Sequence, residues 1–266
     1  MVRLPVLLQL DLSLTLAEDN LSRMLGTMAG KRVAIVQSNY IPWKGYFDLV
    51  NSVDEFILFD DVQYTVRDWR NRNKIKTAHG IIWLSIPIEV KGKFHQKIRE
   101  ARICDLNWQA RHWKSITQAY GKARYFEQYR AYLAALYQDS SAQYLSEINY
   151  RFLSTLCFLL GIRTPLAWSS DYEIVPGKTE RLVALCQQAG ATEYVSGPAA
   201  KSYLDETLFA KAGICVRWMD YSGYPEYPQL FPPFEHAVSV IDLLLNEGPN
   251  AWRYMKSFAK NEHDRE

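Results

Sequence analysis

Two adjacent carboxylates, Asp60 and Asp61, end a strongly apolar run, "EFILFDD". An acid at the carboxyl end of a buried strand can act as a general base, or it can bind a hydroxyl, an amine or Mg²⁺. Neighbouring side chains of a strand point to opposite faces, so both acids reach one pocket only where the strand has already ended. The alternative is an aspartate pair that starts a turn. We expect one carboxylate in the site and the other in the turn.

Basic residues follow directly, in the run 67–76, where five cations alternate with aromatic and amide side chains. Arginine forks bind phosphate or carboxylate and asparagine amides can hold sugar hydroxyls, so Arg70, Asn71 and Arg72 favour a nucleotide or nucleotide-sugar site. A solvated basic loop is the alternative. We expect no specific nucleic-acid partner, because one short basic run offers few phosphate contacts.

A second candidate anion site is the stretch "VSGPAAKSYL", which runs from a strand through Ser196 and Gly197 into a helix. Free backbone amides at a helix N-terminus, together with Lys201, can cradle an anion. The stretch lacks the GxxxxGK[ST] pattern of a P-loop, so an ordinary turn between strand and helix is an equal alternative.

Two further candidates lie in polar or proline-rich surroundings. His95, in "KGKFHQKIRE", can exchange protons near neutral pH, although most such histidines have no catalytic role. Tyr227 belongs to "YPEYPQL", which precedes a final helix predicted over "EHAVSVIDLLLNEG" with His236 at its start. That aromatic segment can form a lid or a platform for a sugar, or it can simply pack as a proline-rich loop.

The elements that position these residues begin with a βαβ unit. "RVAIVQS" is a β-branched run typical of a strand buried on both faces, "GYFDLVNSVD" has helical spacing, and "EFILFDD" is a second strand. Such a unit predicts a parallel sheet, whose ligands bind outside the carboxyl ends of the strands. The loop 39–45 and the two acids fall at that edge.

The remaining patterns complete the predicted fold class. A turn at His79 and Gly80 joins two antiparallel strands, and helical spacing continues from "NWQARHWK" to Gly161. A second α/β segment contains the strands "PLAWSSDY", "EYVSG" and "ICVRWMDY". The sequence therefore predicts an α/β protein with a Rossmann-like parallel sheet, an inserted β-hairpin and a helical middle region.

Composition sets the outer limits. A chain of 266 residues that is 48% hydrophobic can form one α/β domain, predicted over 31–258, with an extension at 1–30 and a polar tail at 259–266. The extension can be a start-site artefact, because Met28 is a second plausible initiator, and its apolar stretch is too short to span a membrane. A net charge of +2 argues against a dedicated nucleic-acid binder. The four cysteines show no metal-ligand or disulfide spacing, so we expect no metal site.

The quoted motifs, taken together, resemble the WbqC-like protein family of bacteria from Arg32 to the last helix. The matching positions are Gln37, Tyr40, Pro42, Gly45, Tyr46, 60–64 ("DDVQY"), 70–72 ("RNR") and 196–198 ("SGP"). Many members begin the motif with His-Gln-Pro, but this chain has Val36, Gln37 and Ser38, so no catalytic histidine is expected there. The resemblance implies a cytoplasmic bacterial protein linked to the biosynthesis of O-antigen and other surface polysaccharides. A glycine or aminoacyl transferase role has been proposed for the family.

The first βαβ unit also resembles that of HIGH-type nucleotidyltransferases and pantothenate synthetase. In those proteins a glycine and histidines hold ATP phosphates at the first helix. Gly45 matches, but both histidines are missing. This resemblance implies a nucleotide-binding Rossmann-like fold while arguing against adenylyl transfer.

We therefore predict a transferase that attaches a glycine-like amino acid or related acyl group to a sugar or glycan precursor. Asp60 or Asp61 would act on the acceptor, with His95 as a further acid–base candidate, while Arg70, Arg72 and Lys201 would bind phosphate or carboxylate. The other predicted pocket residues are Gln37, Tyr40, Gly45, Tyr46, Gln63, Tyr64, Asn71, Ser196, Gly197 and Tyr227.

Two questions stay open at this point. The acyl donor is either made with ATP on this protein or arrives already activated, as a thioester or an aminoacyl-tRNA. The protein itself can instead be a non-catalytic accessory that binds a nucleotide-sugar or glycan, or a degenerate nucleotidyltransferase. In each case we expect the loop 39–45, the two acids, the arginines and the Ser-Gly-Pro turn to converge on a single cleft.

Overall fold

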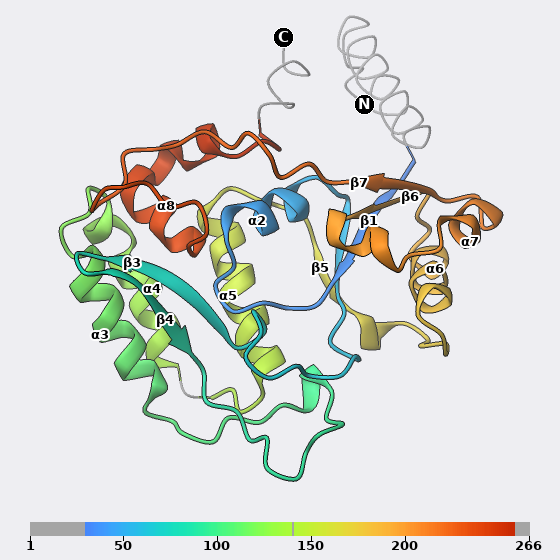
Figure 1. The fold of residues 1–266 in the computed structure, drawn as a ribbon, viewed down its shortest axis with the longest axis horizontal. Coiled ribbons are helices and arrows are strands. Elements are labelled where there is room, and N and C mark those ends of the chain that lie inside the picture. Colours follow the sequence, from blue (N-terminus) through green and yellow to red (C-terminus); the bar gives the residue numbers. More distant parts are fainter. Residues whose placement is uncertain (1–29, 140, 259–266) are drawn as a thin grey trace, which may run out of the picture.

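A parallel five-stranded sheet forms the centre of the protein (Figure 1). The computed structural model describes residues 30–139 and 141–258, so the predicted tail and nearly all of the predicted extension lie outside the described residues. The strands pair in the order β5-β2-β1-β6-β7, and every pairing is parallel. Their bounds are Arg32–Val36 for β1, Glu55–Leu58 for β2, Leu166–Trp168 for β5, Glu193–Ser196 for β6 and Cys215–Trp218 for β7.

The apolar run of β1 is buried on both faces, as its sequence predicts. Val33 and Ile35 pack on one side of the sheet in a cluster with Leu185. Ala34, which points the other way, packs in a second cluster with Phe47. A strand with two buried faces needs a continuous apolar sequence rather than an alternating one.

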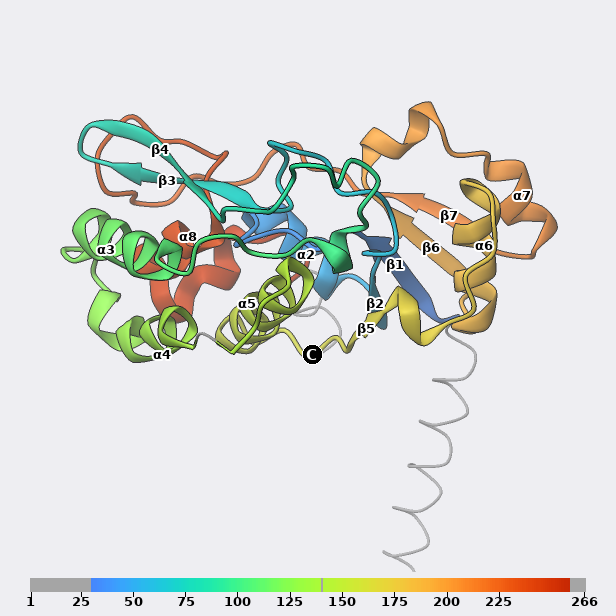
Figure 2. The same ribbon diagram turned by 90° about the horizontal axis from the view of Figure 1, so that it is seen from below.

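Helices cover both faces of the sheet, with α6 and α7 on one side and α2, α5 and α8 on the other (Figure 2). The helices that precede β5 have the bounds Lys44–Asn51 for α2, Trp108–Tyr120 for α3, Phe126–Gln138 for α4 and Leu145–Leu159 for α5. Those that follow β5 have the bounds Thr179–Gln188 for α6, Glu206–Lys211 for α7 and Val240–Glu247 for α8. No helix in the described ranges is long and apolar enough to cross a membrane.

The predicted hairpin is present as β3 (Arg72–Thr77) and β4 (Gly80–Ser85), paired in antiparallel register with Lys74 opposite Trp83. It lies beside α3 and α8, apart from the parallel sheet (Figure 1). Gly80 adopts φ +106° at the turn, a conformation that other residues rarely reach. The hairpin thus extends the helical half of the molecule.

Two predicted boundaries that bear on candidate residues are wrong. The last helix begins at Val240, where Ser239 caps it by accepting a hydrogen bond from the Ile241 amide, and His236 lies in the preceding loop. Strand β2 ends at Leu58, so both acids lie in the turn that follows. A strand ends where its backbone leaves the sheet, and a hydrophobicity pattern does not report that point.

The strand order has a direct functional implication. Numbered along the chain, the five parallel strands lie in the order third, second, first, fourth, fifth, which is the order of doubly wound Rossmann-like folds. The predicted fold class is therefore confirmed. The order reverses between β1 and β6, and ligands of such sheets bind in the crevice at that switch point.

Candidate functional site

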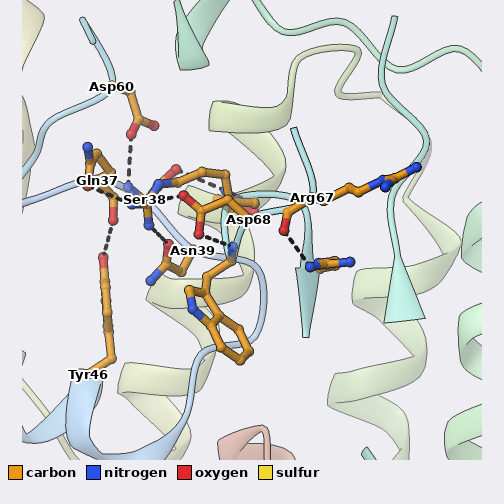
Figure 3. Close-up of polar contacts among 11 residues, drawn as sticks. Gln37, Ser38, Asn39, Tyr46, Asp60, Arg67 and Asp68 are labelled. Carbon is orange, nitrogen blue, oxygen red and sulfur yellow. Dashed lines mark hydrogen bonds and ion pairs between the residues drawn. The ribbon is translucent and has the colours of Figure 1, made fainter. Parts of the chain in front are cut away.

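The loop between β1 and α2 leads away from the switch point and is held by Arg70. The guanidinium donates from Nη2 to Oε1 of Gln37, at 2.8 Å, and from Nη1 to Oδ1 of Asn39. Figure 3 shows Asp60 and Tyr46 on opposite sides of this segment; the Tyr46 hydroxyl donates to the Gln37 carbonyl at 3.1 Å. One arginine therefore fixes the relative position of two polar side chains that are two residues apart.

The same loop carries a strained backbone. Ile41 has φ +38°, which is unfavourable for a β-branched residue, and its side chain is fully buried. The Asn73 amide donates to the carbonyls of Tyr40 and Ile41, at 3.2 and 3.0 Å, and so stabilises this conformation. Strain that is held by specific contacts is typical of ligand-binding loops.

Asp60 lies beneath the loop and is 1% exposed. Its oxygens accept bonds from the Ser38 amide, at 2.8 Å, and from the Ser146 hydroxyl on α5. Burial raises the pKa of this carboxyl, while these hydrogen bonds act in the opposite direction. Asn149, also on α5, donates at 2.9 Å to both the Ser38 hydroxyl and the Arg70 carbonyl. The geometry makes Asp60 an anchor for the loop.

Asp61 points elsewhere. Its carboxylate contacts Nε of Arg99 at 3.0 Å and Nζ of Lys97 at 3.4 Å, and it accepts a bond from the Ser169 hydroxyl at 2.9 Å. These partners come from the segment after the hairpin and from the end of β5. The neighbouring acids thus have entirely different surroundings, even though the strand has ended.

The first pocket, here called the switch-point pocket, has a volume of about 330 Å³. Polar groups reach it from the ends of β1 and β6 and from the start of α6, namely Gln37, Ser196, Gly197, Lys178 and Arg181. Its apolar walls include Phe59, Leu182 and Tyr194. Cations and the free amides of α6 make this end of the pocket favourable for an anion.

The second pocket, here called the tryptophan pocket, has a volume of about 310 Å³. Its lining comes from the strained loop, from the segment before and within β3, and from the loop before α8. The lining residues are Asn39, Pro42, Trp43, Trp69, Asn73, His236 and Ala237. Two indoles and two amides therefore surround one small cavity.

Arg70 connects the linings of the two pockets, although it lines neither pocket itself. Gln37 lines the switch-point pocket and Asn39 lines the tryptophan pocket, and the guanidinium binds both. The predicted single cleft is therefore two pockets in the structure, and neither is lined by all four predicted motifs. Nε of Arg70 is buried without a hydrogen-bond partner in the described part of the chain.

Several predicted pocket residues lie in the core. The Tyr40 hydroxyl is 3.0 Å from Nδ1 of His112 and 2.6 Å from the Tyr137 hydroxyl, and Tyr40 is fully buried. Burial lowers the pKa of His112 to about 4, so its ring stays neutral at physiological pH. Tyr227 donates to Asp242 on α8 at 2.7 Å.

Gly45 has a steric role in the first turn of α2. A Cβ there would lie 2.3 Å from the Trp43 ring, so the indole occupies its place in the tryptophan pocket only over a glycine. Cβ atoms do not approach other heavy atoms so closely, which explains the residue type. The structure thus links Gly45 to the pocket indirectly, through Trp43.

The other predicted residues line neither pocket. Gln63 donates to the Phe94 carbonyl at 2.8 Å, the Tyr64 amide donates to the Gln96 carbonyl at 2.9 Å, and His95 is exposed. The Asn71 amide donates to the Ile86 carbonyl at 2.7 Å. The Arg72 guanidinium lies 4.1 Å from the Trp83 ring, and the Lys201 ammonium lies 5.5 Å from the Trp218 ring.

Sequence reasoning missed the cations of α6 and the two indoles. Lys178 and Arg181 occupy the start of a helix that follows Gly177, the type of position that binds phosphate in parallel α/β sheets. That placement was available from the sequence, whereas the meeting of Trp43 with Trp69 was not. Among the described residues, no group of three or more His, Cys, Asp or Glu side chains could hold a metal ion.

A doubly wound parallel sheet with a pocket at its switch point defines a Rossmann-like α/β protein. The sequence profile of the WbqC-like protein family matches residues 37–254, so the chain belongs to this family. The chain is similar to the uncharacterised protein Rv1507c of Mycobacterium tuberculosis, with 54% identity over 226 residues, which is 85% of this chain and 98% of that protein. No solved structure matches the chain.

Proposed function

We propose that the protein is a transferase that binds a nucleotide-linked sugar in the switch-point pocket and attaches an acyl group, such as an aminoacyl group, to that sugar. The observation that carries the proposal is the placement of Lys178 and Arg181 beside the Ser196–Gly197 turn, in one pocket at the switch point. Cations at this position complement a diphosphate.

The pocket also suits the rest of a nucleotide. Phe59 and Leu182 supply apolar walls against which a base can pack. Nε of Arg181 donates to the Val175 carbonyl at 2.9 Å, and within the described ranges its terminal nitrogens have no carboxylate partner. The guanidinium is therefore fixed in direction but still available to a ligand.

The transfer itself requires an activated acyl donor. This donor is a thioester, an ester, or an acyl phosphate that is made with ATP. The bond between the acyl carbon and its leaving group breaks, a new bond forms to the amine or hydroxyl of the sugar, and the proton of the acceptor leaves with the leaving group or to solvent. Arg70 would position Gln37 and Asn39 at the linkage, since its guanidinium hydrogen-bonds both side chains. The contacts of Asp60 favour a role in positioning the loop rather than in taking up this proton.

A second candidate function is a non-catalytic protein that binds a nucleotide-sugar. Both oxygens of Asp60 and of Asp61 accept bonds or pair with cations from the protein, and this observation favours binding without acid–base catalysis. The two candidates share the switch-point pocket and differ only in whether a product forms.

Calorimetry with uridine, thymidine and guanosine diphosphates and their sugar derivatives tests the shared part of the proposal. We expect Arg181→Ala to weaken the nucleoside diphosphate that binds by about tenfold or more, because a charge-assisted hydrogen bond is lost. Arg130→Ala is the matched control, since Arg130 is an exposed arginine on α4 that pairs with Glu127. Equal affinity of Arg181→Ala and the unchanged protein would contradict the proposed site.

Mass spectrometry of the sugar decides between the two functions. The protein is incubated with the nucleotide-sugar that binds, glycine and ATP, and in parallel with an aminoacyl thioester in place of glycine and ATP. A sugar whose mass increases by one acyl group supports the transferase, and release of AMP or ADP identifies the ATP-dependent route. Tight binding with no mass change in either reaction supports the accessory protein.

A further inference from the structure

The tryptophan pocket is not needed to bind a nucleotide, yet Trp69, which lines it, is exposed and lies against a second exposed indole, that of Trp83. Trp69 and Trp83 are each 42% exposed, and their rings lie 5.3 Å apart at 37°. The Trp69 amide donates to Asp68 at 2.7 Å and its carbonyl accepts a bond from the Tyr40 amide, so the segment is fixed. Adjacent exposed indoles on a fixed backbone mark a binding surface.

The lining of the pocket indicates the class of ligand. Indole faces of Trp43 and Trp69 can pack against the C–H face of a sugar ring, and the Asn39 amide at the same cavity can bond one of its hydroxyls. The Asn39 amide uses its oxygen for Arg70, and its nitrogen has no partner in the described ranges. A volume of about 310 Å³ is at the lower end for small-molecule sites, which suits one ring with its substituents.

Positive charge lies at the rim of this pocket. The Lys74 ammonium is 5.8 Å from the Trp69 ring and 5.2 Å from the Trp83 ring, and the Arg72 guanidinium is 4.1 Å from the Trp83 ring. In the part of the chain that the structure describes, neither cation forms an ion pair with a carboxylate, and Asp68, the residue before Trp69, pairs with Arg70 at 3.6 Å. Unpaired cations beside a sugar-binding surface favour a sugar that carries a negative charge.

We infer that the tryptophan pocket binds a pyranose ring bearing a carboxylate, as the sugar part of the ligand whose nucleotide occupies the switch-point pocket. The link between the two parts rests on the proposed function. Arg70 would position that link, because its guanidinium hydrogen-bonds Gln37, which lines one pocket, and Asn39, which lines the other. Two pockets whose lining residues are only two positions apart in the chain can hold two parts of a single molecule.

Calorimetry with uridine diphosphate, uridine diphosphate glucose and uridine diphosphate glucuronic acid tests the inference. We expect affinity to increase about tenfold or more from uridine diphosphate to uridine diphosphate glucuronic acid. Part of the increase should come with the sugar ring and the rest with the carboxylate. Trp69→Ala should remove the gain in affinity that the sugar ring gives over uridine diphosphate. Lys74→Gln should remove only the gain that the carboxylate gives over uridine diphosphate glucose. Tyr132→Ala is the control, since Tyr132 is an exposed aromatic residue on α4, and it should leave the series unchanged. Circular dichroism verifies that each variant is folded.

Saturation-transfer NMR with free glucuronic acid and free glucose examines the tryptophan pocket on its own. A signal for glucuronic acid that Trp69→Ala abolishes supports the sugar site, even where no nucleoside diphosphate binds and the proposed function fails. Nucleotide binding that is equally tight with and without the sugar, together with no NMR signal, overturns this inference and leaves the proposed function standing. The inference is also overturned if Trp69→Ala still binds uridine diphosphate glucose more tightly than uridine diphosphate.

Discussion

The two pockets are built in different ways. The switch-point pocket is made by regular elements, since the carboxyl ends of β1 and β6 and the start of α6 supply its polar groups. The tryptophan pocket is made by loops, and side-chain hydrogen bonds from other elements hold those loops in place. Topology alone therefore requires the first pocket, whereas the second depends on a small number of individual contacts. Substitutions that remove those contacts should affect the two pockets unequally.

The largest effect is expected from Asp60→Ala. This change leaves the Ser38 amide and the Ser146 hydroxyl buried without their acceptor and should lower the free energy of unfolding by roughly 3 kcal/mol. The melting temperature should fall by about 6 to 12 °C. Sugar binding in the tryptophan pocket should be lost more completely than nucleotide binding, because the loop is displaced. Urea denaturation and calorimetry measure the two effects.

Glu127→Ala is the control for this change, since Glu127 is an exposed carboxylate that pairs only with Arg130 among the described residues. It should alter the free energy of unfolding by less than about 0.5 kcal/mol. Equal loss at both pockets in Asp60→Ala would mean that the switch-point pocket also depends on the loop, and the contrast between the pockets would not hold.

Arg70→Ala should weaken a nucleotide-sugar by about 1.5 to 3 kcal/mol, because charge-assisted hydrogen bonds at the junction are lost. Arg70→Lys should restore little of this affinity, since one ammonium cannot bond Gln37 and Asn39 in the planar geometry of a guanidinium. Arg130→Ala is again the matched control. Calorimetry with the nucleotide and the sugar measured separately shows whether Arg70 serves both pockets; a loss confined to one of them would place the residue in that pocket alone.

Lys44 makes a smaller, pH-dependent contribution to the free energy of unfolding. Its ammonium is buried 5.0 Å from the Tyr224 ring and 5.2 Å from the Tyr227 ring, and it donates to the Pro225 carbonyl at 3.0 Å. Burial lowers the pKa of Lys44 from 10.5 to about 8. Between those values the unfolded chain binds more protons than the folded one, so the contribution of this group to stability increases as pH rises.

The expected gain from Lys44 is roughly 1 kcal/mol between about pH 7.5 and 9.5, which is below the full shift because a lysine can relax toward solvent. Tyr224 and Tyr227 stay protonated over this range, since burial raises their pKa. Urea denaturation at the two pH values measures the gain, and Lys44→Met should abolish it. A gain that persists in Lys44→Met would assign the titration to another group.

Asp61→Asn should have the smallest effect. Its partners Lys97 and Arg99 have side chains that are 41% and 45% exposed, so the two ion pairs are partly screened by water. We expect a loss of about 1 kcal/mol in the free energy of unfolding and no change in affinity for the nucleotide or the sugar. A loss of affinity in calorimetry would bring Asp61 into the site and revise the contrast between the adjacent acids.

Much of the fold could be predicted from the sequence. The βαβ unit, the hairpin and the second α/β segment follow from patterns that depend on near neighbours, and the parallel order of the sheet follows from short strands joined by helices. The start of α8 could not be predicted, because Glu235 and His236 continue an acceptable helical spacing while the backbone there still belongs to a loop. The choice depends on contacts with β3, such as the bond from the Ser239 amide to the Lys74 carbonyl.

The candidate site was only partly predictable. A tyrosine or an asparagine that folds a loop has the same chemistry as one that binds a ligand, so Tyr40 and Asn71 could not be separated from Gln37 by residue type. The separation depends on distant partners, such as Tyr137 for Tyr40 and Ser146 for Asp60. Such pairs bring together residues from the first and second halves of the chain, and no local pattern records them.

The order of the sheet also affects how the protein folds as it is synthesised. β1 pairs with β2 soon after both are made, but its other edge pairs with β6, which follows the whole helical middle region. Until β6 leaves the ribosome, β1, a strand that the folded sheet buries on both faces, has an open edge that can pair with another chain. Folding is therefore expected to be slow and exposed to aggregation, because the central strand must pair with a distant part of the chain.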